Sequence, residues 1–531
     1  MLSPTFLIAL LLFSLLIIYV RRRRRRRRQN LSPSNFPPGP PPIPILGNLH
    51  QVPLKKAYLQ FTKWSRQYGP ILGLRFGPQK VIVLNNWRSV RDLFDQRGSI
   101  YSSRPDIAIA QHVVPGDRHL AFMKYDKRWR RGRKTINDFL KDEVVSKLLP
   151  IQDAESTQMV WEVMNEPAGY YGHVMRQFAS VILASVYEQR GKVHRGERTE
   201  QFYAVQDEWA AVLDPGAMPP YDIFPVLRYV PDAWTPWRGW RKRADDLGNK
   251  QGGLYRELFQ EAKVRVRNGQ GSTTFAATLL ANQEKEGYSD AELEYIAGFM
   301  LEAGADTTAM SFLTFIVALA AYPNVLKQAQ KEVDEVFGDS KMPGSLEGIK
   351  LPYIQGCFWE TLRWRPALPI AIPHAIDKDD MYQGYGISAN STVIMNIWAI
   401  HHNPEDYPNP DVFDPARFLT SKFGVANSTP EAEADLTRRE SYAFGAGRRV
   451  CAGQKMAENS LVLAMAKFVW AFDVVWMGEE ALDTNVETAW KDAILTAPKE
   501  VPIGFSVRGE KREEIIRKEW SKAEAYLKKF E

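Results

Sequence analysis

Cysteine is almost absent from this sequence: Cys357 and Cys451 are the only two among 531 residues. Two cysteines cannot form the disulfide scaffold of a small secreted protein, which favours a reducing compartment for the body of the chain. Gly/Ser linkers and internal repeats of about 20–50 residues are also absent, which argues against separate domains or a repeat architecture. After Pro44 the sequence therefore predicts one large domain, although its length alone would allow about two to four.

Excess positive charge is also absent from most of the chain. The net charge is +7, but the eight arginines of residues 21–28 contribute +8, which leaves −1 for the rest. A nucleic-acid-binding domain normally spreads basic residues over its folded surface. The positive net charge therefore comes from the arginine block alone, and we expect no nucleic-acid partner.

A long apolar run occupies residues 2–20, and the arginine block follows it at once. The run is close to the roughly 20 residues that a helix needs to cross a bilayer, so we predict a transmembrane signal anchor over residues 1–20. No charged residue precedes it and no Ala-x-Ala cleavage site follows it, unlike a removed signal peptide. Arginines stay on the cytosolic side, so the body is expected in the cytosol, behind a polybasic segment (21–30) that attracts anionic lipid. A nuclear-localisation or nucleic-acid patch is the alternative interpretation of the arginines.

Proline is dense between Phe36 and Gly47. Proline at this density stiffens the chain into a polyproline-like spacer. We therefore predict a proline-rich hinge over residues 31–48 that sets the angle of the body to the membrane. A ligand for a proline-binding module is the alternative.

The remaining residues, 49–531, have a mainly helical pattern with a few short strands. Residues 71–76 and 80–84 predict two strands joined by Gly-Pro, and residues 382–387 and 391–396 predict a second strand pair around a turn. The fold class is therefore mainly α with small β-sheets.

The longest helical pattern begins at the capping box Ser289–Glu292 and ends at Ala321, before Tyr-Pro. It is apolar nearly all round from Ala297 to Ala321, which indicates a buried core helix. A second membrane span is the alternative, and the acids Glu302 and Asp306 inside the run count against it.

A polar motif, Ala303-Gly-Ala-Asp306-Thr307-Thr308, interrupts this apolar helix. A buried acid beside two hydroxyls is costly unless it is used or hydrogen-bonded. A threonine hydroxyl can also bond back to the carbonyl four residues earlier and loosen the helix. The motif therefore predicts a small polar groove that holds dioxygen and relays protons. A helix kink without chemistry is the alternative.

The loop Phe444-Gly-Ala-Gly447-Arg-Arg449-Val-Cys451-Ala-Gly453 is the most informative segment of the chain. It places a lone cysteine among small residues and arginines, just before a helical run that begins at Gln454. A thiolate in this setting is suited to be an axial ligand of haem iron, with glycines that let the porphyrin approach and an arginine for a propionate. An inert buried cysteine is the general alternative.

Two further groups support this interpretation. Glu360 and Arg363 lie at i and i+3 on one predicted helix face, and Arg417 could join them in a cluster that holds the region onto the cysteine loop. Trp129 and Arg133 lie at i and i+4 in a basic helix and could donate to a haem propionate. The other basic residues there predict either a solvated face or a docking surface for an acidic redox partner.

These four motifs occur in the order found in the cytochrome P-450 family, the haem-thiolate monooxygenases, and the chain resembles that family over nearly its whole length. The runs 397–402 and 368–374 resemble fungal microsomal members of secondary metabolism. The family usually has glutamate where Ala416 stands, which puts the hydrogen bonding around Arg417 in doubt. The resemblance implies haem b, with roles as follows: Cys451 as the axial ligand; Trp129, Arg133, His374 and Arg449 at the propionates; Phe444, Gly447 and Gly453 in the haem loop; Asp306 and Thr307 in proton delivery to dioxygen; Glu360, Arg363 and Arg417 as the structural cluster.

The same resemblance implies an enzyme that inserts one oxygen atom from O2 into a lipophilic small molecule. Electrons would come from NADPH through a separate cytochrome P-450 reductase, with cytochrome b5 as a further candidate partner. The single-pass protein would lie in the endoplasmic reticulum membrane with a cytosolic catalytic domain. The pocket would draw on loops 101–122 and 202–225 and on the following residues, for which ordinary core packing is the alternative: Phe299, Met300, Ala303, Leu368, Ile370, Ile494 and Leu495.

Two other functions remain open on the sequence. A haem-thiolate isomerase or dehydratase would rearrange oxygenated substrates without a reductase. Such a reaction needs no proton delivery to dioxygen, so the intact Asp306-Thr307 pair favours the monooxygenase. A membrane-anchored haem protein without catalysis is the third possibility.

Overall fold

The computed structural model describes residues 35–194, 196–271, 273–346, 348–426, 437–491 and 493–531. The predicted anchor (1–20), the polybasic segment (21–30) and the start of the predicted hinge lie outside the described residues.

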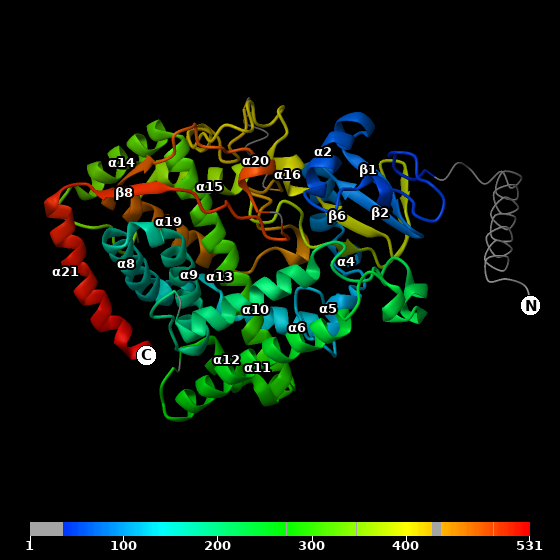
Figure 1. Cartoon of the computed structure of the whole chain (residues 1–531), viewed down its shortest axis with the longest axis horizontal. Coiled ribbons are helices and arrows are strands. Elements are labelled where there is room, and N and C mark those ends of the chain that lie inside the picture. Colours follow the sequence, from blue (N-terminus) through cyan, green and yellow to red (C-terminus); the bar gives the residue numbers. More distant parts are fainter. Residues whose placement is uncertain (1–34, 195, 272, 347, 427–436, 492) are drawn as a thin grey trace, which may run out of the picture.

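The chain is mainly helical, as the sequence predicts. Figure 1 shows a large helical region beside a smaller sheet region that contains β1, β2 and β6. The described helices are α2 (Ala57–Tyr68), α3 (Trp87–Val90), α4 (Gly98–Tyr101), α5 (Ala108–Val113), α6 (Lys127–Phe139), α7 (Asp142–Val145), α8 (Leu149–Asn165), α9 (Tyr170–Tyr187), α10 (Glu197–Leu213), α11 (Trp240–Arg267), α12 (Phe275–Glu286), α13 (Asp290–Ala321), α14 (Pro323–Phe337), α15 (Pro352–Trp364), α16 (Ile397–His401), α17 (Arg417–Thr420), α19 (Gln454–Ala471), α20 (Val486–Ala489) and α21 (Glu510–Leu527).

Three small sheets accompany the helices. The largest has the strand order β1-β2-β6-β3, and the other two are the pairs β4-β5 and β7-β8. Their bounds are β1 (Ile71–Phe76), β2 (Gln79–Leu84), β3 (His374–Ala375), β4 (Asp380–Tyr382), β5 (Tyr385–Ile387), β6 (Thr392–Met395), β7 (Phe472–Trp476) and β8 (Ile503–Val507). The predicted β1-β2 hairpin is confirmed, with Ile71 opposite Leu84.

The predicted pairing of residues 382–387 with 391–396 is wrong. Gln383 and Gly384 have φ angles of 50° and 78°, so a tight turn divides the first of these runs and pairs β4 with β5. The second run is β6, whose four residues are all buried. It pairs in parallel with the buried half of β2, where Ile82 lies opposite Val393, because burial on both faces favours a central position.

Helix α13 forms the centre of the fold, as predicted. Its Ser289 capping box is present, and the helix ends where Tyr322 precedes a proline. It is the one described helix apolar and long enough to cross a membrane, but 78% of its apolar window is buried inside the protein. Small residues allow this packing: a Cβ at Gly298 would lie 2.2 Å from the Tyr255 ring of α11.

The described part of the proline-rich segment packs on β1 and does not stand off as a free spacer. The Asn48 side chain donates to the Pro40 carbonyl at 2.8 Å and accepts from the Arg75 amide at 2.8 Å. Gly47 has a φ of 66°, and a Cβ there would lie 2.2 Å from the Arg75 carbonyl oxygen, so only glycine fits. The segment is therefore joined to the sheet before the body begins.

Candidate active site

The cysteine loop is held in shape by its own backbone and by the segment around Asp95. The Cys451 amide donates to the Phe444 carbonyl at 2.7 Å, and α19 begins at Gln454 as predicted. Gly447 has a φ of 66°, and a Cβ there would lie 2.3 Å from the Phe94 carbonyl oxygen. Its amide donates to the Asp95 carboxylate at 2.7 Å. These contacts fix the loop that presents Cys451.

The Cys451 residue is solvent-exposed, although protein atoms pack closely around its loop. That packing raises the pKa of the thiol, while the Gly453 amide and the Arg133 guanidinium act in the opposite direction. A coordinating metal deprotonates a thiol outright. Among the described residues no three His, Cys, Asp or Glu side chains form a metal-binding group. A metal on Cys451 would therefore bring its other ligands with it, as iron does in a porphyrin.

A partly buried cluster of cations lies beside this loop. Arg449 stacks on the Trp129 ring at 4.2 Å, and Arg133 donates to the carbonyl of Val450. Burial and the neighbouring Arg133 lower the pKa of Arg449 to about 9. Burial and Arg449 likewise hold the pKa of Arg104 well below its usual value.

No described carboxylate lies within 4.0 Å of these three guanidinium groups. Arg104 and Arg449 instead donate to main-chain carbonyls, at 2.6 Å in the shortest contact of each. The pKa of His374 is lowered strongly, first by burial and then by Arg104. Clustered arginines without a carboxylate partner are suited to an anion, so the residues fit the two propionates of a haem.

Arg104 is the part of this cluster that sequence reasoning missed. It lies in the stretch 101–122, which was predicted only as pocket lining. Its one local signal is an arginine directly before a proline, which is not specific. The predicted members Trp129, Arg133, His374 and Arg449 are brought together as expected.

Helix α13 presents two different stripes of side chains near its middle. Ala303 is exposed although the helix around it is buried, and the Thr307 hydroxyl donates to the Ala303 carbonyl at 2.9 Å. Glu302 directly precedes Ala303 and Asp306 directly precedes Thr307, so these two acids form the neighbouring stripe. Residues four apart share a helix face, so Thr307 and Asp306 point to adjacent faces.

Asp306 is 5% exposed, and its Oδ1 atom has no hydrogen-bond partner. Burial, followed by the charges of Glu302 and Asp207, raises the pKa of Asp306 to about 8. At neutral pH this carboxyl therefore keeps its proton. A protonated acid on the helix stripe beside that of the Thr307 hydroxyl is suited to serve as a store of protons.

Glu302 accepts hydrogen bonds from three elements that are far apart in the sequence. The donors are His119 Nε2 at 3.0 Å, Trp209 Nε1 at 2.9 Å and the Tyr255 hydroxyl at 3.2 Å. Burial disfavours the carboxylate, but His119 and these bonds outweigh it and hold the pKa of Glu302 below its ordinary value. No local sequence pattern indicates this cluster, because its members are separated by tens of residues.

The predicted Glu360 cluster is present and buried. Glu360 binds Arg363 through both oxygens, at 2.6 and 2.7 Å, and its nearest contact with Arg417 is 3.6 Å. Arg363 also donates to the His401 carbonyl at 3.0 Å, and His401 accepts the Tyr442 amide at 3.1 Å. The cluster is thereby connected to the start of the cysteine loop, as predicted.

The predicted pocket residues differ in their surroundings. Phe299 packs edge-on against His119 at 5.7 Å, and Met300 is buried in the same apolar cluster. Leu368 and Leu495 are half-buried, and Ile494 is 38% exposed. Ile370 contacts two apolar clusters beside β6.

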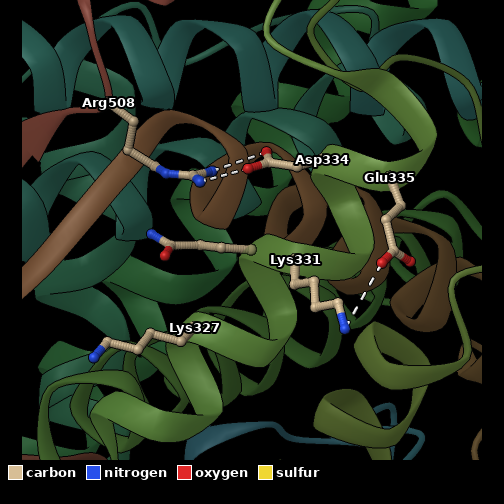
Figure 2. Close-up of a pocket in the computed structure, with 6 residues that line it drawn as sticks. Lys327, Lys331, Asp334, Glu335 and Arg508 are labelled. Carbon is tan, nitrogen blue, oxygen red and sulfur yellow. Dashed lines mark hydrogen bonds and ion pairs between the residues drawn. The ribbon is translucent and has the colours of Figure 1, made fainter.

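A surface groove of about 500 Å³ lies elsewhere, between α14 and the residue after β8. Figure 2 shows two ion pairs among its side chains: Arg508 with Asp334, at 2.6 Å, and Lys331 with Glu335, at 3.9 Å. None of the predicted site residues lines it. It is therefore a charged surface feature and not the site that the motifs indicate.

The fold, the cysteine loop and the cation cluster together define a haem-thiolate class of protein. Comparison with known proteins agrees: the cytochrome P450 family model matches residues 37–505. The chain belongs to the cytochrome P450 family, and as an enzyme it is an oxidoreductase of the monooxygenase type.

Individual relatives extend this match. Cytochrome P450 monooxygenase fogE of Aspergillus ruber is 35% identical over 494 residues, which are 92% of this chain and 90% of the relative. Cytochrome P450 monooxygenase patI of Penicillium expansum is 32% identical over 531 residues, which are 100% of this chain and 99% of the relative. A zebra fish cytochrome P450 solved with progesterone has a TM-score of 0.71 at 23% identity, over 85% of this chain and 99% of its own, and shows a shared fold.

Proposed function

We propose that the protein is a membrane-anchored haem-thiolate monooxygenase that oxidises a lipophilic small molecule in fungal secondary metabolism. The observation that carries the proposal is the pairing of one exposed cysteine with a partly buried arginine cluster that has no carboxylate partner, beside its loop. At one end of the site the cysteine offers a soft ligand to a metal, and at the other end the arginines suit two carboxylates. An iron and two propionates are the corresponding groups of haem b. The fungal relatives support the metabolic setting.

The residues divide the work of holding the cofactor. Cys451 would hold the iron through its thiolate, and Trp129, Arg133, Arg449, Arg104 and His374 would hold the propionates. The Glu360 cluster keeps the cysteine loop in place through His401 and Tyr442. When bound, the haem supplies the activation of dioxygen and the transfer of one oxygen atom to the substrate.

The chain itself controls protons and water. The Thr307 hydroxyl is oriented by its bond to the Ala303 carbonyl, on the exposed stripe of α13. Asp306 lies on the next stripe and stores a proton at neutral pH. The apolar side chains Phe299 and Met300 exclude water, and they favour a lipophilic substrate.

Membrane attachment and electron supply complete the proposal. The apolar run 2–20 and the arginines that follow it support a single-pass anchor with a cytosolic body in the endoplasmic reticulum. Electrons would come from NADPH through a separate reductase, with cytochrome b5 as a second candidate donor. The basic face of α6 supports docking of an acidic partner, because Lys127 and Arg130 are exposed there.

The test is turnover of the purified protein with a reductase, NADPH and isotopically labelled dioxygen. The substrate can be found by metabolite profiling of a deletion strain. We expect one labelled oxygen atom in the product, and no product without the reductase. Complete turnover of a hydroperoxide with no reductase would replace the proposal with an isomerase or dehydratase. Cys451→Ser is the control: it should abolish the red-shifted band of the ferrous carbon monoxide complex, and an unchanged band would refute the ligand assignment.

A further inference from the structure

Two carboxyl groups lie on one stripe of α13, a single turn apart. The side chain of Glu302 is 16% exposed, and Asp306 is 5% exposed. Two carboxylates this close in a buried setting cannot both ionise cheaply, so one of them keeps a proton. Which one keeps it depends on the hydrogen-bond donors around each.

The donors are distributed very unequally. Glu302 receives an imidazole N–H from the 114–126 loop, an indole N–H from α10 and a hydroxyl from α11. Asp306 Oδ1 receives none. Donors stabilise a carboxylate more strongly than a carboxylic acid, so the negative charge belongs on Glu302 and the proton on Asp306.

The other charges around the pair do not reverse this assignment. His119 and Tyr255 face Glu302, and Tyr203 and Asp207 of α10 lie near Asp306. Asp207 is negative and favours the protonated form of Asp306 further. After burial, Glu302 and Asp207 are the charges that raise the pKa of Asp306.

We propose that Glu302 is a positioning residue for the reaction: held by His119, Trp209 and Tyr255, its carboxylate charge adds to burial in keeping the neighbouring Asp306 protonated. The use of that proton in catalysis rests on the proposed function, whereas the protonation of Asp306 does not. This role also assigns a purpose to a buried carboxylate that costs desolvation and that an apolar pocket does not otherwise need.

The protonation can be measured without substrate or turnover. Infrared spectra of the purified haem-bound protein, taken across a pH series, report protonated carboxyl groups through their C=O stretch. Asp306→Asn identifies the band of Asp306. In the wild type we expect this band to persist through neutral pH and to titrate near pH 8.

Glu302→Gln removes the charge and keeps the shape of the side chain. We expect it to move the Asp306 titration down by about one to two pH units, which is about a 10- to 100-fold change in the equilibrium. Trp209→Phe removes one donor to Glu302 and should give a smaller shift in the same direction. Glu294→Gln is the matched control, since it removes a glutamate from the same helix three turns away and should leave the titration unchanged.

The outcomes are separable. An Asp306 band absent at neutral pH in the wild type, or a titration that Glu302→Gln does not move, overturns the role of Glu302. A structural role alone would lower stability in Glu302→Gln and Trp209→Phe without moving the titration. Failure of NADPH-dependent oxygen insertion would overturn the proposed function and leave the infrared result standing.

Discussion

Replacing Asp306 with asparagine should make the protein more stable, and the gain should grow with pH. The folded protein keeps the Asp306 proton up to about pH 8, whereas an unfolded aspartate loses it near 3.8. Between these two pH values the folded state binds one proton more than the unfolded state, so the free energy of unfolding falls as the pH rises. Asparagine is neutral and of similar size, so it removes that pH dependence and little else.

The magnitude follows from the width of the window. Each pH unit above 3.8 costs the wild type about 1.4 kcal/mol, which gives about 3 kcal/mol at pH 6 and about 4 kcal/mol at pH 7. Above pH 8 the penalty stops growing. An unfolding entropy of about 2.1 cal/mol/K per residue over 531 residues converts 4 kcal/mol into a rise in Tm of about 4 °C.

Thermal unfolding of the haem-bound protein, followed by far-ultraviolet circular dichroism at several pH values, measures this gain. We expect Asp306→Asn to melt about 1–2 °C above the wild type at pH 5 and about 4 °C above it at pH 7. Glu294→Gln on the same helix should show no such widening. A gain that is independent of pH, or a loss of stability, would show that Asp306 is ionised in the folded state and would refute the reasoning.

Three other changes test the rest of the site. Thr307→Ala should keep the carbon monoxide band but divert NADPH electrons to peroxide, because the oriented hydroxyl is lost; tightly coupled product formation would contradict this. Arg104→Met should lower the ratio of haem to protein in purified samples, since it removes a propionate donor, and full haem occupancy would argue against that role. Glu360→Gln should lower the Tm by several degrees, because it leaves the buried Arg363 without its charge partner at a cost of about 3–5 kcal/mol; an unchanged Tm would count against the brace.

Local signals allowed much of the fold to be predicted from the sequence. The capping box at Ser289 and the proline after Tyr322 determine both ends of α13, and both were located correctly. The β1-β2 hairpin follows from its short Gly-Pro connection. The position of β6 did not follow, because its partner β2 is about 300 residues away and no local pattern encodes that pairing.

The same distinction applies to the site. The cysteine loop and the Asp306-Thr307 motif are contiguous in the sequence, so their residue types and spacing indicate their chemistry. Arg104 and the partners of Glu302 are placed by tertiary packing. In the sequence, Glu302 indicates only that the helix is not a membrane span. Its bonds to His119, Trp209 and Tyr255 form only when three separate elements meet in the folded protein.

The arginine cluster links cofactor binding to folding. Burial lowers the pKa of all three guanidinium groups, and Arg133 further lowers that of Arg449, as Arg449 does that of Arg104, so an anion beside them would be favourable. A ligand that binds only the folded state stabilises it in proportion to its affinity, so a haem with two carboxylates would contribute to folding as well as to catalysis. The cost of burying Arg104 and of partly burying Arg133 and Arg449 would therefore be offset further in the haem-bound protein, and for this reason loss of haem should precede unfolding of the helical core.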